Sequence, residues 1–186
     1  MGKSYDHITD KLKAFIEAQK VFFVATAPMI ENGHVNVSPK GYDSFKIIDK
    51  NTVAYADLGG SGIETLAHIK ENGRITIMFM AFEGKANIVR LYGKGEAISF
   101  DDPGFDELMQ MFPGFDRVRS VIKINVHKSM DSCGFAVPFY EFKGERDQLI
   151  RTHRNKELED WREYRYDRNQ VSLDGLEGLV KPDNAN

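Results

Sequence analysis

Closely spaced strand-like segments constrain the fold of this chain more than any other feature. Runs rich in β-branched and aromatic residues follow one another with short turn signals between them, and helical patterns are few. This organisation predicts a mainly β domain with peripheral helices, an α+β fold arranged as a small barrel and not as βαβ units. The predicted strands are residues 21–27, 34–38, 45–48, 51–58, 75–81, 87–99 and 120–126.

Helical periodicity is confined to a few segments of the chain. Apolar residues at helical spacing predict a first helix over about residues 6–18, with Asp6 as its cap. A short helix is expected over 101–111, and a charge-rich C-terminal helical extension over about 147–166. No stretch has the composition of a linker, so residues 1–186 are predicted to form a single domain.

Two glycines interrupt the longest predicted strand. Gly93 and Gly95 lie within 87–99, and glycine inside a strand often marks a bend at a barrel corner or a close approach of two backbones. We therefore expect a local distortion of the sheet at this point.

Composition argues against several classes of protein. Lys and Arg number 25 against 28 Asp and Glu, a net charge of −3 that gives no general attraction to nucleic acid or to an anionic membrane. The single cysteine, Cys133, cannot form an intramolecular disulfide, and the start MGKSYDHITDKLK is too polar for a signal peptide. A cytoplasmic protein without nucleic-acid or membrane partners is therefore expected. The five histidines show no metal-binding spacing with that cysteine.

The segment YADLGGSGIET, residues 55–65, is the first candidate binding element. A strand-like run ends in three glycines around Ser61, and a helical pattern begins at once. Ser61 and Glu64 have the spacing of a capping box, and Asn72-Gly73 supplies a stop signal. Unpaired amides and the macrodipole at a helix N-terminus attract anions, so a cofactor phosphate is expected here. A tight turn that merely begins a helix is the alternative interpretation.

The segment HVNVSPKG, residues 34–41, is the second candidate. Side chains alternate along a strand, so Asn36, Ser38 and Lys40 are expected on one face, and Val35 and Val37 in the core. An amide, a hydroxyl and an ammonium in a row suit a phosphate and the polar edge of a ring. Phosphate contacts alone would scarcely give micromolar affinity, so a nucleotide-like cofactor with an aromatic ring fits better than free phosphate. An ordinary amphipathic edge strand is the alternative.

Other catalytic motifs are incomplete. The third glycine of a dinucleotide fingerprint, a Walker lysine and the closing glycine of a nucleophile elbow are missing near Ser61. Cys133 and His127 could form a nucleophile pair, but a small buried cysteine before Gly134 is the favoured interpretation. Trp161 is interpreted as a packing or interface residue.

Four segments in order give the chain a family resemblance. They are VNVSPKG, YADLGGSGIETLAHIKENGRITIMF, VRLYGKGEAI and INVHKSMDSCGFAVPFYEFKGERD, and they cover most of residues 20–150. Together they resemble the flavin-binding split-barrel family related to pyridoxamine 5′-phosphate oxidase. The resemblance implies a six-stranded antiparallel split β-barrel, a homodimer, and FMN bound in the cleft between the subunits.

The resemblance also implies which residues contact FMN. Those that would line the flavin and its phosphate are Asn36, Val37, Ser38 and Lys40. Those that would meet the phosphate at the helix start are Ser61, Gly62 and Thr65. Those that would approach the flavin held mainly by the partner subunit are Cys133, with the adjoining Gly134, Trp161 and Arg162.

The chain departs from the oxidase pattern in two places, which limits how much of the oxidase's activity the resemblance implies for it. Ser61 and Gly62 stand where the oxidase has a basic pair, so the phosphate would be held by backbone amides and Lys40. The C-terminal arginine and histidine segment of the oxidase is matched only loosely by DWREYR, residues 160–165. Oxidation of pyridoxamine phosphate is therefore not expected.

Three functions remain open at this point. The first is an FMN-dependent oxidoreductase in which flavin N5 accepts a hydride from an unidentified small substrate or a nicotinamide. The second is a flavin- or haem-binding module of the same fold without turnover. The third, a small-barrel nucleic-acid binder, is disfavoured by the acidic balance.

Overall fold

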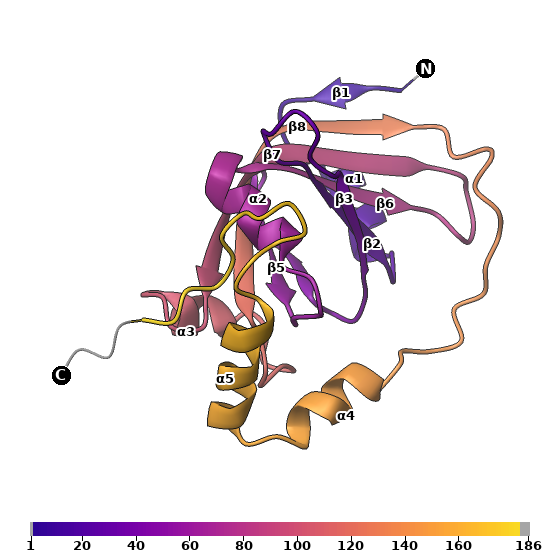
Figure 1. Ribbon diagram of the computed structural model, residues 1–186. Coiled ribbons are helices and arrows are strands. Elements are labelled where there is room, and N and C mark those ends of the chain that lie inside the picture. The colour runs from indigo at the N-terminus through magenta and orange to yellow at the C-terminus, as the bar shows by residue number, and fades with distance from the viewer. Residues whose placement is uncertain (1, 183–186) are drawn as a thin grey trace.

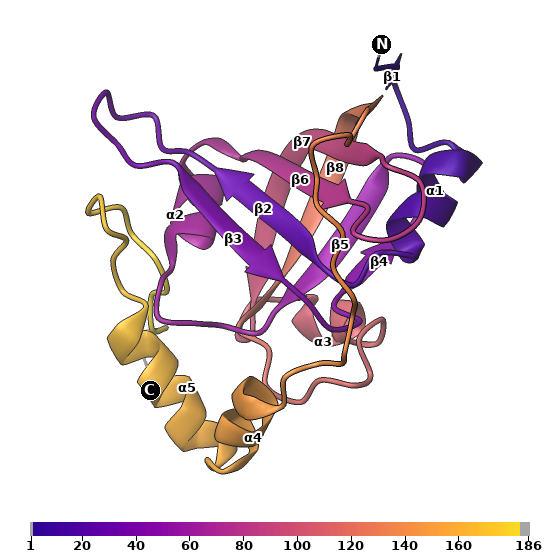
Figure 2. The same ribbon diagram turned by 90° about the vertical axis from the view of Figure 1, so that its right-hand side faces the viewer.

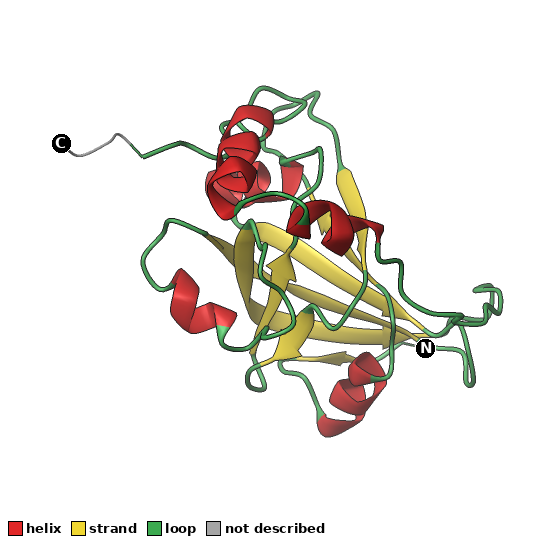
Figure 3. Ribbon diagram, turned by 90° about the horizontal axis from the view of Figure 1, so that it is seen from below, coloured by secondary structure: helices red, strands yellow, loops and turns green. Residues whose placement is uncertain are grey.

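The computed structural model describes residues 2–182, which form one curled antiparallel sheet with helices around it (Figure 1). Seen from below, the helices lie outside the curl of the sheet (Figure 3). The strands are β1 (Ser4–Tyr5), β2 (Phe22–Thr26), β3 (Asn36–Lys40), β4 (Phe45–Ile47), β5 (Thr52–Asp57), β6 (Arg74–Met80), β7 (Ile88–Ser99) and β8 (Ser120–Ser132). The helices are α1 (Asp10–Glu17), α2 (Glu64–Asn72), α3 (Phe105–Met109), α4 (Gln148–Arg154) and α5 (Leu158–Arg168).

The sheet is an open half-barrel. Its strands follow the order β3-β2-β6-β7-β8-β5-β4, and β1 pairs with β8. The six longer strands confirm the predicted split barrel, and the short β1 and β4 bring the sheet to eight strands. The curl brings the second strand of this order, β2, close to the last strand, β4 (Figure 2). Phe22 of β2 packs against Phe45 of β4 with ring centroids 5.2 Å apart.

The distortion predicted at Gly93 is a shift of register between β7 and β8. The shift lies between Tyr92 and Gly93, where a Cβ on the glycine would be 2.6 Å from the carbonyl oxygen of Asn125. Only glycine allows so close an approach of two backbones. Gly95 lets α2 pack closely, because a Cβ there would lie 3.0 Å from Ile69 of that helix.

The first helix begins later than predicted. Thr9, and not Asp6, caps α1, and the Thr9 hydroxyl accepts a hydrogen bond from the amide of Leu12 at 3.3 Å. The carboxylate of Asp6 instead faces His7, with 2.6 Å between the two side chains. A hydroxyl three residues before a free amide has the better capping geometry.

The predicted capping box at the start of α2 is wrong. The helix begins at Glu64, its N-cap position is Ile63, and no side chain caps it. The predicted stop is confirmed, because Gly73 has φ +70° and donates its amide to the carbonyl of Ile69 at 2.9 Å. The amides before Glu64 are therefore free of side-chain caps.

The C-terminal extension is two helices and not the single helix predicted over 147–166. Helix α4 ends at Arg154, Glu157 is extended, and α5 then begins at Leu158. Before them, residues 133–147 form a long irregular segment, the strap, which runs from the end of β8 to α4 (Figures 1 and 2). The helix expected over 101–111 is reduced to α3.

Two apolar clusters hold these elements together. One fills the curl of the sheet and includes the buried face of α1. The other joins β5 and β8 to α2, α3 and α5, and Trp161 of α5 is only 1% exposed within it. Packing of Trp161 against Phe100, with ring centroids 5.6 Å apart, fixes α5 to the sheet. No helix within residues 2–182 is long and apolar enough to cross a bilayer.

Candidate functional site

A glycine-rich loop between β5 and α2 forms the centre of the candidate site. Three of its carbonyl groups face inward and accept hydrogen bonds from side chains of distant elements. The carbonyl of Gly60 accepts from Arg165 at 2.8 Å, that of Ser61 from Asn169 at 3.4 Å, and that of Gly62 from Arg119 at 2.7 Å. Residues 60–62 are exposed to solvent.

The inward carbonyls decide where the amides point. In a planar trans peptide the N–H is opposite to the C=O, so the amides of Ser61, Gly62 and Ile63 point away from these three side chains. No hydrogen bond from these amides is found among residues 2–182. Consecutive free amides at the start of a helix form an anion-binding concavity. The structure therefore leaves these amides available as hydrogen-bond donors.

Gly59 makes the inward turn of the loop possible. Its φ is +76°, a region that L side chains rarely adopt, and a Cβ there would lie 3.3 Å from the guanidinium carbon of Arg165. Glycine is thus needed both for the backbone conformation and for the close approach of the arginine.

A buried ion cluster lies behind the loop. The side chain of Asp57 is 1% exposed and accepts hydrogen bonds from Arg119 at 2.7 and 3.1 Å and from Lys40 at 3.2 Å. Burial by itself would raise the pKa of Asp57, but the charges of Arg119 and Lys40 hold that pKa well below its usual value. Asp57 is therefore a carboxylate at any physiological pH.

Arg165 is the cation that this carboxylate does not neutralise. The residue is 5% exposed and forms no salt bridge among the described residues. Its guanidinium contacts the Gly60 carbonyl, the His153 ring nitrogen at 3.2 Å, and the face of Trp161, while its Nε has no partner. With Lys40 and Arg119, three cations surround one carboxylate, so this region carries an excess positive charge.

His153 must stay neutral beside Arg165. Burial and the neighbouring charge of Arg165 lower the pKa of His153 to about 4. A neutral ring can accept a hydrogen bond from the Arg165 guanidinium, which a protonated ring cannot.

Polar residues of β3 face the loop and the start of α2. The Asn36 amide donates to the hydroxyls of Thr65 at 2.9 Å and Thr26 at 3.2 Å, and Ser38 donates to the Asn36 carbonyl at 3.2 Å. Thr26 in turn lies 3.0 Å from the ring of the fully buried His68. The expected shared face of Asn36, Ser38 and Lys40 is thus confirmed.

The valines at and just before β3 are a correction to the sequence analysis. Val35 and Val37 were expected in the core, but they are 70% and 59% exposed. β3 ends the strand order, and its inner face is occupied by the polar side chains that contact α2 and β5. The apolar face is therefore the one left uncovered in this chain.

The residues predicted to approach the partner's flavin do not lie together at the loop. Cys133 is exposed at the end of β8, which contradicts a buried cysteine, and it lies outside the loop region. Trp161 is enclosed in the core, as the packing interpretation predicted. Arg162 lies at the surface of α5 beside Phe100, 5.5 Å from its ring centroid, and Asp101. Four residues that complete the loop were missed: Asp57, Arg119, Arg165 and Asn169.

One carboxylate opposes anion binding. The side chain of Glu64 folds over Gly62, and its carboxylate accepts a hydrogen bond from the amide of Leu173 at 3.3 Å. A negative charge over Gly62 must weaken the attraction of the neighbouring amides for an anion.

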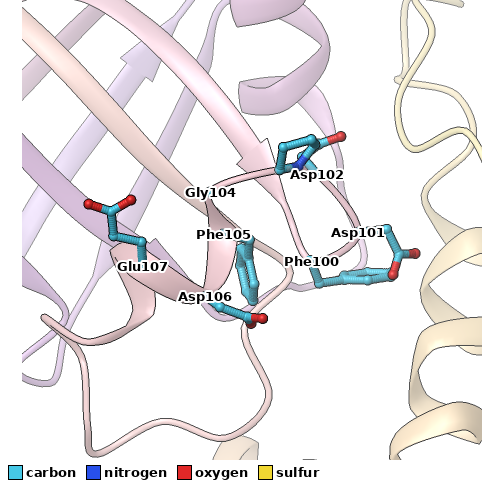
Figure 4. A pocket seen from close by; sticks show the side chains of 8 residues that line it. Phe100, Asp101, Asp102, Gly104, Phe105, Asp106 and Glu107 are labelled. Atoms are coloured by element: carbon cyan, nitrogen blue, oxygen red, sulfur yellow. The ribbon is translucent and has the colours of Figure 1, made fainter.

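Two surface hollows differ in their suitability for a ligand. The smaller, of about 490 Å³, lies over the acidic turn Phe100–Glu107 and contains none of the predicted residues (Figure 4). The larger is a groove of about 920 Å³ that includes Lys40 and lies between the start of β2, the end of β3, the β6–β7 turn and the strap. Backbone hydrogen bonds fix the strap there, including Tyr140 to the Phe82 carbonyl at 3.1 Å. Within residues 2–182 no cluster of three or more His, Cys, Asp or Glu side chains could hold a metal ion.

Comparison with known proteins identifies the family. The sequence model described as pyridoxamine 5′-phosphate oxidase matches residues 8–129, more than half of the chain. The chain belongs to the pyridoxamine 5′-phosphate oxidase family. It is 35% identical over 193 residues to the pyridoxamine 5′-phosphate oxidase family protein ustO of Aspergillus flavus, covering 94% of this chain and 77% of that protein.

Solved structures share the fold of this family member. The crystal structure of HupZ from Group A Streptococcus is 27% identical, with a TM-score of 0.52 over 64% of this chain and 89% of that one. An FMN-binding protein of Syntrophomonas wolfei is 18% identical, with a TM-score of 0.50 over 67% of this chain and 85% of that one. These likenesses agree with the curled half-barrel described above.

Proposed function

We propose that this protein is an FMN-dependent oxidoreductase that holds the cofactor phosphate on the loop between β5 and α2. The observation that carries the proposal is a buried, unneutralised Arg165 behind outward-facing amides of a solvent-exposed loop. A phosphate dianion supplies the missing negative charge and accepts hydrogen bonds from those amides. Family membership and an FMN-binding structural neighbour point to the same group.

Different residues of the chain would bind the phosphate and the flavin ring of FMN. The amides of Ser61 and Gly62, with the hydroxyl of Thr65, would hold the phosphate, and Lys40 would add charge at its side. Asn36 and Ser38 would offer their polar groups to the flavin ring edge, with the backbone of Val37 between them. When bound, FMN supplies the hydride-accepting chemistry, while the protein contributes position and electrostatics.

The groove of about 920 Å³ beside Lys40 is the proposed place for the substrate or a nicotinamide. Its size is in the range of small-molecule sites, and the aromatic side chains of Tyr42, Phe82, Tyr140 and Phe142 contribute to its lining. Tyr42 is held with φ +60°, a strained conformation for a residue with a side chain. Strain of this kind fits a residue whose position is fixed for binding.

A homodimer is part of the proposal. Single chains rarely leave large apolar side chains uncovered over a wide area. Yet Val35 before β3, Val37 within it, and Phe135 and Phe139 of the strap are all exposed. A partner subunit over these surfaces would bring a second strap, with its Cys133, toward the flavin. Sedimentation should give a dimer, and a monomer that still binds FMN would contradict this arrangement.

Absorbance and anaerobic reduction test the function. Freshly purified protein, or protein incubated with FMN and desalted, should retain flavin bands, and NADH or NADPH should bleach them without oxygen. Protein that stays colourless in both preparations would contradict the proposal.

A module that binds flavin or haem without turnover is the second candidate. Its support is that the side chains proposed to contact FMN are neutral, as in Asn36, Ser38 and Thr65, or held in an ion pair, as in Lys40 with Asp57. None is therefore poised to transfer a proton. Flavin bands that no nicotinamide bleaches, or a haem spectrum after incubation with haem, would favour the module.

A further inference from the structure

We propose that Arg165 and Asn169 of the C-terminal segment, with Arg119 just before β8, are positioning residues that set the affinity of the loop for phosphate. This inference rests on the proposed function, in which the loop holds the phosphate of FMN. None of the three side chains needs to touch the cofactor. Each binds the carbonyl of a loop peptide, and the amide of the same peptide points the other way.

The loop needs external support to present its amides. Gly59, Gly60 and Gly62 give this short segment more conformational freedom than any other residue type would. No side chain caps α2, so nothing inside the loop fixes the direction of its peptides. The donors come instead from Arg119, Arg165 and Asn169, which are 57 to 108 residues away from their acceptors.

Each donor selects one orientation of one peptide. If the peptide between Gly60 and Ser61 turned over, the Gly60 carbonyl would lose its 2.8 Å hydrogen bond from Arg165, and an N–H would face the guanidinium. The same holds for Asn169, whose amide lies 3.4 Å from the Ser61 carbonyl and 3.5 Å from that of Gly60. Hydrogen bonds on the inner side of the loop therefore hold its amides pointing outward even when no anion is bound.

The support is rigid because α5 is docked firmly. Trp161 is buried in the second apolar cluster, and the Arg165 guanidinium stacks 5.5 Å from its ring centroid and 5.2 Å from that of Tyr164. Asn169, which follows α5, is fully buried and also receives a hydrogen bond from Arg119 at 3.0 Å. Helix α5 is therefore coupled to the cofactor loop through these side chains, which gives Trp161 a role without ligand contact.

Binding of FMN and riboflavin to the full chain tests the inference, since riboflavin lacks only the phosphate. We expect Arg165→Gln to weaken FMN binding about 10-fold to 100-fold, the range of one lost charge-assisted hydrogen bond. Asn169→Asp loses a neutral hydrogen bond and should weaken FMN binding about 2-fold to 10-fold. Riboflavin affinity should change by less than about 3-fold, because the ring contacts on β3 remain. Arg168→Gln is the matched control, because Arg168 is an exposed arginine of the same helix; it should leave both affinities unchanged.

The outcomes are separable. If the wild type binds FMN no better than riboflavin, the phosphate site itself is wrong, and the proposed function and this inference fall together. If the wild type prefers FMN and both variants keep that preference, only the positioning role is overturned. Two choices guard against a result due only to misfolding. Asn169→Asp changes no side-chain volume. Arg165→Lys should restore part of the preference for FMN over riboflavin that Arg165→Gln loses. Melting curves on every variant show whether the fold is retained.

Discussion

Replacing Asp57 by asparagine should destabilise the protein by about 3–5 kcal/mol, the range for removing one partner of a buried ion pair. The side chains of Asp57 and Arg119 are 1% and 4% exposed, so the substitution leaves a buried guanidinium without a carboxylate. Asp43→Asn is the matched control: it breaks the exposed pair with Lys46, worth at most about 1 kcal/mol.

Urea denaturation at neutral pH measures both losses of unfolding free energy, and repeating it in acid adds a second test. Because the folded pKa of Asp57 lies below its usual value of 3.8, its contribution is complete above that pH and is lost as the pH falls through the lowered pKa. The stability of Asp57→Asn should therefore depend less on acid pH than that of the wild type. A loss no larger than that of Asp43→Asn would refute the view that Asp57 organises the cations behind the loop.

Three further substitutions probe neighbouring parts of the site. His153→Gln should remove a loss of stability between pH 6.5 and about 4, since only the unfolded chain binds a proton there. The lowered pKa corresponds to about 3 kcal/mol, and an unchanged pH profile in denaturation would contradict it. Glu64→Gln should strengthen FMN binding about 2-fold to 5-fold in a fluorescence titration by removing the carboxylate over Gly62, and weaker binding would show that this charge is not repulsive. Gly59→Ala should cost about 1–3 kcal/mol and exceed the cost of Gly104→Ala, which has a similar φ but open space around its Cβ; equal costs would mean that contact with Arg165 is not tight.

The strands were predictable because their signal is local. Alternating or continuous apolar runs with turn residues between them mark β2, β5, β6 and β7 within a residue or two of their ends. The same alternation defines two faces of β3 without saying which one is covered. In this edge strand the polar side chains contact α2 and β5, so the polar face turns inward. For this reason Val35 and Val37 were misplaced.

The supporting cations of the site could not be predicted from local pattern. Arg119 and Arg165 look like ordinary charged residues, and their contacts with the loop depend on how β8 and α5 pack. One signal did exist: Asp57 ends the apolar run TVAYAD, and a carboxylate there would be buried and need a cationic partner. That reasoning predicts a partner but not which of 25 basic residues it is.

A crystal structure of the protein with FMN tests the central claim most directly. The account predicts phosphate oxygens within hydrogen-bond distance of the amides of Ser61 and Gly62, with Arg165 still bonded to the Gly60 carbonyl. A phosphate bound elsewhere, for instance on Lys20 or Arg146 in the larger groove, would contradict it.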